Sequence, residues 1–215
     1  MCVVVLAWPA RADPGARTTL ALVIGSNRGA LVARPDLHFA DDDAARFYET
    51  FRMLAAADDV ALLTTFDRDS DRQHGPLRDR AKPPSRANVR SAASTFAARA
   101  KELRAAGGEV DFYFVFAGHG DVDHGEGFIE LEDGPFTSRD LEDVLRTVSA
   151  TRAHVILDSC NSVFMVSARK PGGQHFATGE AAARQLATRM PDVGVFLSTS
   201  AEEEVFEWSE LGAGI

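Results

Sequence analysis

The stretch Val110–Ala117, VDFYFVFA, gives the strongest indication of a buried β-strand in this chain. All but one of its side chains are apolar or aromatic, and an unbroken run of this kind is typical of a parallel strand that is covered on both faces. Gly118-His119-Gly120 follows directly. This stretch therefore predicts a buried strand and also a histidine that leaves the sheet at the end of that strand.

Further buried strands and helices are predicted on both sides of this stretch. The apolar runs predict strands at Thr19–Gly25, Val60–Thr65, Ala153–Leu157 and Val193–Thr199, with a shorter strand at Gly127–Glu132. The 3–4 spacing of apolar residues and the helix-end residues predict helices over Ala40–Leu54, Ser85–Ala106, Thr137–Val148 and Glu180–Arg189. Asp67–Pro84 is polar and contains two consecutive prolines, which predicts a long surface loop. Alternating strands and helices predict an α/β fold with a mainly parallel central sheet and helices on both faces.

Composition excludes several classes of protein. Of the 215 residues, 45% are hydrophobic and 26% charged, as in ordinary globular domains. The formal net charge of −9 argues against a nucleic-acid partner, because such domains usually carry a basic face. No apolar run approaches the ~18 residues that a membrane-spanning helix needs. Cys2 and Cys160, the two cysteines, cannot form a disulfide framework.

The first 17 residues are expected to lie outside the folded domain. The apolar run Met1–Trp8 is followed by Ala10-Arg11-Ala12, which resembles the end of a secretory signal peptide with its cleavage site. A basic segment before the apolar run is missing, so a disordered tail remains the alternative. The first interpretation implies an exported protein and the second a cytoplasmic one. In both cases the domain is expected to span residues 18–215.

Two strand ends carry the residues that favour catalysis. His119 follows one predicted buried strand, and Asp158-Ser159-Cys160 follows another. Ligands of parallel sheets bind at the carboxyl ends of the strands, so neighbouring strands would bring this imidazole and this thiol together. An adjacent imidazole can take the proton of a thiol, and the Gly120 and Cys160 N–H groups are candidate oxyanion donors. A turn histidine and a packing cysteine are the plain alternative, but their joint occurrence favours a catalytic dyad.

Here the chain resembles a known family. The motifs FVFAGHG and VILDSCNS are similar to those of the caspase-like cysteine peptidases, most of all the metacaspase and bacterial caspase-homologue branch, from Thr19 to Ile215. The resemblance implies a caspase-hemoglobinase fold, with His119 as general base and Cys160 as nucleophile. Family members usually continue beyond the equivalent of Ile215, so residues 18–215 are expected to be the large-subunit portion, without the C-terminal part.

The resemblance also implies a substrate class. Metacaspase-like members cut after Arg or Lys and have an acid two residues before the cysteine, which is Asp158 here. In Leu37–Ala44, Asp43 best matches a second acid of the S1 pocket, with Asp42 as the alternative. Ser198 is expected to line the substrate groove. The segment after His119 contains nine acids and one base, Arg139, and this charge would attract basic peptides. The acids are Asp121, Asp123, Glu126, Glu130, Glu132, Asp133, Asp140, Glu142 and Asp143.

The resemblance also bears on activation and on cofactors. In this family the loop after the nucleophile often carries the activation cut, which would follow Arg169. Some metacaspases need calcium, but the spacing of Asp121, Asp123 and Glu126 does not follow the 12-residue EF-hand loop, so we expect no cofactor or metal and keep calcium as the alternative. An upstream activator or a fused sensor domain is an expected partner, besides the protein or peptide substrate. The predicted function is a cysteine endopeptidase that cuts after Arg or Lys; the alternatives are a non-catalytic caspase-like interaction or signalling module and a hydrolase of small amides.

Overall fold

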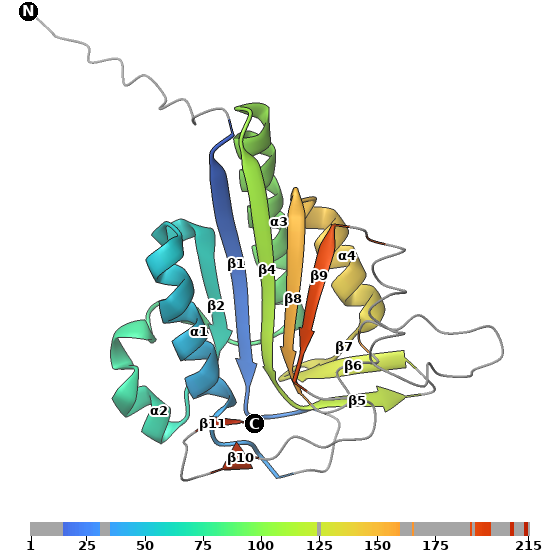
Figure 1. Cartoon of the computed structure of the whole chain (residues 1–215). Helices are drawn as coiled ribbons and strands as arrows, with labels where there is room; N and C mark the ends of the chain where they lie inside the picture. The colour runs from blue at the N-terminus through green and yellow to red at the C-terminus, as the bar shows by residue number, and fades with distance from the viewer. Residues whose placement is uncertain are drawn as a thin grey trace, which may run out of the picture.

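The computed structural model describes residues 15–30, 35–123, 126–159, 165, 190 and 192–198, and the backbone of 207–208 and 213–214. Six strands form the central sheet in the order β3-β2-β1-β4-β8-β9, and every pairing in it is parallel. Figure 1 shows their arrowheads pointing to one edge. The strands are β1 (Arg17–Ser26), β2 (Val60–Thr64), β3 (Ala81–Lys82), β4 (Glu109–Gly118), β8 (Arg152–Asp158) and β9 (Val193–Leu197).

The centre of the sheet is the pair β1 and β4, both of which contain apolar runs predicted to be buried strands. The two strands are in register along their whole length, from Arg17 opposite Glu109 to Ser26 opposite Gly118. The inner residues Leu20–Ile24 are fully buried, because helices cover these strands on both faces. The predicted α/β class, with a mainly parallel sheet between two layers of helices, is confirmed.

Helices cover the two faces of the sheet with separate hydrophobic cores. α1 (Ala40–Leu54) lies in front of β1 and β2 in Figure 1, and its Tyr48 and Phe51 pack on that face. α3 (Arg86–Ala105) and α4 (Ser138–Val148) lie behind the sheet, where Phe96 of α3 packs with Phe112 of β4. The predicted boundaries of all three helices hold within one residue.

A small antiparallel sheet follows β4 at the edge where the strands end. It consists of β5 (Gly120–Asp123), β6 (Glu126–Leu131) and β7 (Gly134–Thr137). β7 leads into α4 through a capping box: the Thr137 side chain accepts from the Asp140 N–H, and the Asp140 side chain accepts from the Thr137 N–H. Figure 1 shows this small sheet beyond the arrowheads of β4 and β8.

The prediction of a surface loop over Asp67–Pro84 is wrong. This segment contains α2 (Arg68–Gln73), the 3-10 turn η2 (Gly75–Leu77) and β3, which pairs with β2. The Asp67 side chain accepts from the Asp69 and Ser70 N–H groups and so begins α2. The segment lacks the apolar periodicity that indicates a helix, because α2 is stabilised by its cap and by contacts with α1.

The remaining elements are short. The 3-10 turn η1 (Ala57–Asp59) joins α1 to β2, and β10 (Glu207–Trp208) pairs antiparallel with β11 (Ala213–Gly214). The predicted helix Glu180–Arg189 lies outside the described residues. Within the described part of the chain, no helix is long and apolar enough to cross a membrane.

Candidate active site

His119 leaves the sheet through a turn that requires glycine. Gly118, the last residue of β4, has a φ of +151°, and a Cβ there would lie 2.8 Å from the Ser26 carbonyl oxygen and 2.7 Å from Phe116 Cζ. A side chain at position 118 would therefore collide with the neighbouring strand as well as strain the backbone. The turn directs His119 beyond the end of the sheet, between β4 and β5.

The His119 ring is oriented by a main-chain carbonyl. Its Nε2 lies 3.1 Å from the Pro35 carbonyl oxygen, in the connection between β1 and α1. A carbonyl oxygen only accepts hydrogen bonds, so the neutral imidazole carries its proton on Nε2. Nδ1 then holds the free lone pair, and this is the nitrogen that can act as a base.

The Gly120 N–H points away from β6. Glu130 N donates to His119 O at 2.9 Å, and Gly120 lies opposite Ile129. In an antiparallel ladder, hydrogen-bonded and non-hydrogen-bonded pairs alternate, so Gly120 and Ile129 form a non-hydrogen-bonded pair. The Gly120 N–H is therefore not used by the ladder, as an oxyanion donor would require.

The end of β8 lies beside the end of β4. The two strands are parallel neighbours, with Ala117 opposite Asp158, so the two motifs do leave the same edge of one sheet. Ser159 is buried, and Asp158 has a buried Oδ1 without a hydrogen-bond partner among the described residues. Cys160 lies outside the described residues, as does Arg169.

Three acids begin α1 at this same edge, and the structure distinguishes them. The helix is capped by Asn27, whose Oδ1 accepts from the N–H groups of Ala40 (2.9 Å) and Asp41 (3.3 Å). Asp41 is fully buried and accepts from the Asp67 N–H at 2.9 Å. It is therefore a structural link from α1 to α2.

Asp42 faces α2 and not an open pocket. Its Oδ1 lies 3.1 Å from His74 Nε2, although the ring is not oriented for a hydrogen bond. Burial, and then the neighbouring Asp41, raise the pKa of Asp42, while a hydrogen bond from Ser70 and the charge of His74 act in the opposite direction. The other candidate, Asp43, pairs with Arg46 at 3.1 Å and is partly buried, whereas Asp42 is buried.

Ser198 lies at the same edge as the other site residues. It follows β9, its N–H donates to the Leu157 carbonyl oxygen at 3.0 Å, and its side chain is exposed. The structure thus brings His119, Gly120, Asp158 and Ser198 to one edge of the sheet. Sequence reasoning missed Pro35 and Asn27. The Pro35 contact is made by the main chain, which leaves no pattern in a sequence.

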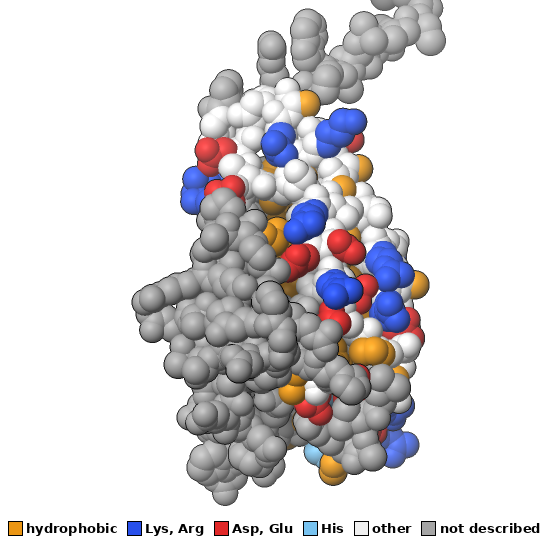
Figure 2. Space-filling view, turned by 90° about the vertical axis from the view of Figure 1, so that its right-hand side faces the viewer, with side chains coloured by type: hydrophobic (Ala, Val, Ile, Leu, Met, Phe, Trp, Pro, Cys, Tyr) orange, Lys and Arg blue, Asp and Glu red, His pale blue; other side chains and the backbone are white. Residues whose placement is uncertain are grey.

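The acidic segment after His119 is partly neutralised by arginines. Asp140 pairs with Arg90 at 3.1 Å, and Glu142 and Glu126 pair with Arg146 and Arg139. Figure 2 shows Lys and Arg side chains interspersed with Asp and Glu on the described part of the face that it views. The count of nine acids therefore overstates the negative charge that a substrate would meet. It omits Arg90, which pairs with Asp140 but lies outside the acidic segment in the sequence. Within the described ranges, no group of three or more metal-ligating side chains could hold a metal ion.

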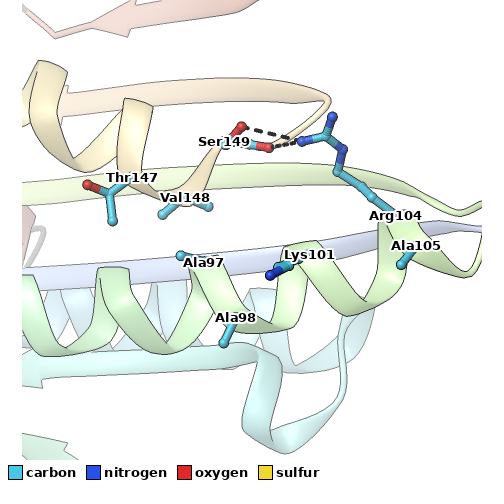
Figure 3. Close-up of a pocket in the computed structure, with 8 residues that line it drawn as sticks. All are labelled: Ala97, Ala98, Lys101, Arg104, Ala105, Thr147, Val148 and Ser149. Atoms are coloured by element: carbon cyan, nitrogen blue, oxygen red, sulfur yellow. Dashed lines mark hydrogen bonds between the residues drawn. The ribbon is translucent and has the colours of Figure 1, made fainter.

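A groove of about 640 Å³ between α3 and α4 lies away from this edge. Figure 3 shows Arg104 of α3 donating to the Ser149 carbonyl oxygen at the end of α4. Lys101 and three alanines of α3 also line the groove. Both cations lie in the last turns of α3, where positive charge complements the negative end of the helix dipole. Their role is accounted for by helix stability, and the groove does not belong to the candidate site.

Comparison with protein families agrees with this geometry. The family model of the caspase domain matches residues 18–212. The chain belongs to the caspase-domain family. A search of the curated proteins finds no match. For this caspase domain, membership supports a peptidase of the cysteine type and a protein substrate, and the six-stranded sheet is consistent with the caspase-hemoglobinase fold.

Proposed function

We propose that this caspase domain is a cysteine endopeptidase with His119 as general base and Cys160 as nucleophile. The observation that carries the proposal is the contact of His119 Nε2 with the Pro35 carbonyl oxygen, 3.1 Å long, which leaves Nδ1 as the basic nitrogen at the edge where β8 ends. A base prepared in this way is what a thiol nucleophile needs, because the thiolate is the reactive species.

The reaction proceeds through a thioester. His119 Nδ1 takes the proton of the Cys160 thiol, and the thiolate attacks the carbonyl carbon of the scissile bond. The Gly120 and Cys160 N–H groups hold the oxyanion. When the C–N bond breaks, the imidazolium gives its proton to the leaving amine. His119 then deprotonates a water molecule, which attacks the thioester and restores the thiol.

We further propose that the enzyme belongs to the metacaspase-like branch and cleaves after Arg or Lys. Asp158 is the principal candidate for the S1 acid, since its buried Oδ1 has no partner in the described part of the chain and could receive a guanidinium. Asp43 is the second candidate and stands before Asp42, whose carboxylate is directed at His74. Ser198 would contribute to the wall of the groove.

Several finer points of the proposal follow the family resemblance. The catalytic domain would span residues 18–215, and self-cleavage after Arg169 would accompany activation. An upstream activator or a fused sensor is the proposed partner. No cofactor is needed for the chemistry, and calcium is the alternative that addition of a chelator would reveal.

Fluorogenic peptides with Arg, Lys or Asp at P1 test this proposal. The full chain should cleave the Arg and Lys peptides, Cys160→Ala and His119→Ala should abolish cleavage, and the matched control Cys2→Ala should retain it. A chloromethyl ketone with Arg at P1 should label Cys160 in the wild type. Cleavage of the Asp series, or undiminished activity of Cys160→Ala, would overturn the assignment; absence of both cleavage and labelling would favour the non-catalytic module.

A further inference from the structure

Glu130 is a buried carboxylate directly across from the proposed catalytic base. It lies on β6 and is 1% exposed. The β5–β6 ladder ends with Gly120 opposite Ile129, and just beyond it Glu130 N donates to His119 O at 2.9 Å, which places Glu130 opposite His119. Opposite residues of an antiparallel pair project to the same face, so the carboxylate and the imidazole leave the ladder on one side.

The Glu130 carboxylate is seated against Gly29. A Cβ built on Gly29 would lie 1.7 Å from Glu130 Oε2 and 2.6 Å from Glu130 Cδ, and its third nearest atom is again part of Glu130. Gly29 therefore leaves the space that this carboxylate occupies. Because Gly29 belongs to the connection after β1, the same connection meets both members of the cross-strand pair: Gly29 meets Glu130, and Pro35 meets His119.

The two described parts of this connection are held to each other. The Leu37 N–H donates to the Asn27 carbonyl oxygen at 2.8 Å, and Arg28 pairs with Asp36 at 3.3 Å. These two contacts tie the Gly29 side of the connection to the Pro35 side. The contacts therefore run from the His119 backbone through Glu130 and the connection after β1 to the His119 ring.

We propose that Glu130 is a positioning residue of the peptidase: seated against Gly29, it holds the Pro35 carbonyl oxygen in line with His119 Nε2 and thereby fixes the tautomer that leaves Nδ1 basic. This inference rests on the proposed function of His119. Glu130 touches neither substrate nor the reacting atoms in this scheme.

The sharpest test is a double-mutant cycle between Gly29 and Glu130 in the full chain. Gly29→Ala and Glu130→Ala should each lower kcat/KM for an Arg-P1 peptide by about 10- to 100-fold, as is found for partners that orient a metal-ligating histidine. Gly29→Ala should add little in the Glu130→Ala background, because Glu130 Oε2 and Cδ, the two atoms closest to its methyl group, are gone and only Glu130 Cβ, at 3.3 Å, remains. Gly75→Ala, where a Cβ meets nothing within 4 Å, is the matched control.

A second readout does not depend on proteolysis. The ¹⁵N shifts of the His119 ring report which nitrogen carries the proton, and the wild type should show protonated Nε2. Glu130→Ala should give a mixture of tautomers, and Glu130→Gln, which keeps the shape of the side chain, should restore most of the Nε2–H form. The Gln variant also serves if the Ala variant does not fold.

The outcomes separate this inference from the proposed function. If the wild type shows no Cys160-dependent cleavage, the proposed function fails, and the ring tautomer alone decides the role of Glu130. If cleavage depends on Cys160 but Glu130→Ala retains the wild-type rate and tautomer, the positioning role is wrong. Full multiplication of the Gly29→Ala and Glu130→Ala effects would equally overturn it.

Discussion

Pro35 and His119 are 84 positions apart in the sequence, yet the Pro35 carbonyl oxygen lies 3.1 Å from His119 Nε2. The two residues meet because β1 and β4 are parallel neighbours that end together, Ser26 opposite Gly118. The connection after β1 and the turn after β4 then share one edge of the sheet. Several predictions about this edge and the core beneath it can be tested by single substitutions.

Asp158→Asn should lower cleavage after Arg selectively. The change keeps the shape of the side chain and removes the charge that would meet a guanidinium. A hydrogen bond to a charged group contributes about 1.5–3 kcal/mol, so kcat/KM for an Arg-P1 peptide should fall about 10- to 150-fold. A peptide with neutral citrulline at P1 should lose much less. Asp58→Asn, at an exposed acid of the turn η1, is the control; an equal loss for both peptides would remove Asp158 from the S1 pocket.

Gly118→Ala should reduce both stability and activity. The new Cβ would meet Ser26 and Phe116, and the φ of +151° is rarely adopted by residues with a side chain. Backbone strain of this kind costs about 1–3 kcal/mol, and the clash adds to it. Gly134→Ala provides the comparison, because Gly134 has a φ of +134° but open space around it. Equal urea midpoints for the two variants would show that the close approach at Gly118 is unimportant.

Asp42→Asn should raise the melting temperature at neutral pH. Burial raises the pKa of Asp42, so the folded protein binds this proton more tightly than the unfolded chain. Ionised Asp42 therefore lowers stability at neutral pH, and this cost disappears as pH falls through the raised pKa towards about 4. The advantage of the variant should shrink over that range. Asp43→Asn on the same helix is the control; an advantage that does not change with pH would contradict the argument.

Phe114→Ala should destabilise the fold by about 3–5 kcal/mol. Phe114 is fully buried and stacks on Phe136 with ring centroids 6.0 Å apart, so truncation leaves a cavity between β4 and β7. Phe196 on β9 is 62% exposed, and Phe196→Ala should change the free energy of unfolding by no more than about 0.5 kcal/mol. Chemical denaturation of both variants measures the difference. Similar values would mean that the assigned core is wrong.

Regular elements with a buried face could be predicted from the sequence, because burial leaves a periodic pattern. The apolar run Val110–Ala117 lies within β4, and Ser85 caps α3 just before its first residue. Thr137 and Asp140 form the capping box at the start of α4, where the sequence predicts a helix. In each case the interaction is local, so the residues that make it are close together in the chain.

Contacts made across the fold could not be predicted in this way. α2 is polar and six residues long, and it depends on the Asp67 cap and on its contacts with α1. Every residue has a main-chain carbonyl, so nothing in the sequence marks the one at Pro35. Its contact with His119 depends on the parallel pairing of β1 and β4. From the sequence, Glu130 is only one acid of a charged segment, because burial of a carboxylate against a residue about 100 positions away leaves no local pattern.

The use of a peptide oxygen to orient His119 has a consequence for mutational screens. Any amino acid at position 35 still supplies that oxygen, so amino-acid exchange there cannot delete the acceptor, although it can alter the backbone path. Insertions or deletions between Asn27 and Leu37 shift the oxygen away from the ring and should therefore be the most damaging changes in this region. A screen confined to point substitutions would overlook one of the groups on which the base depends.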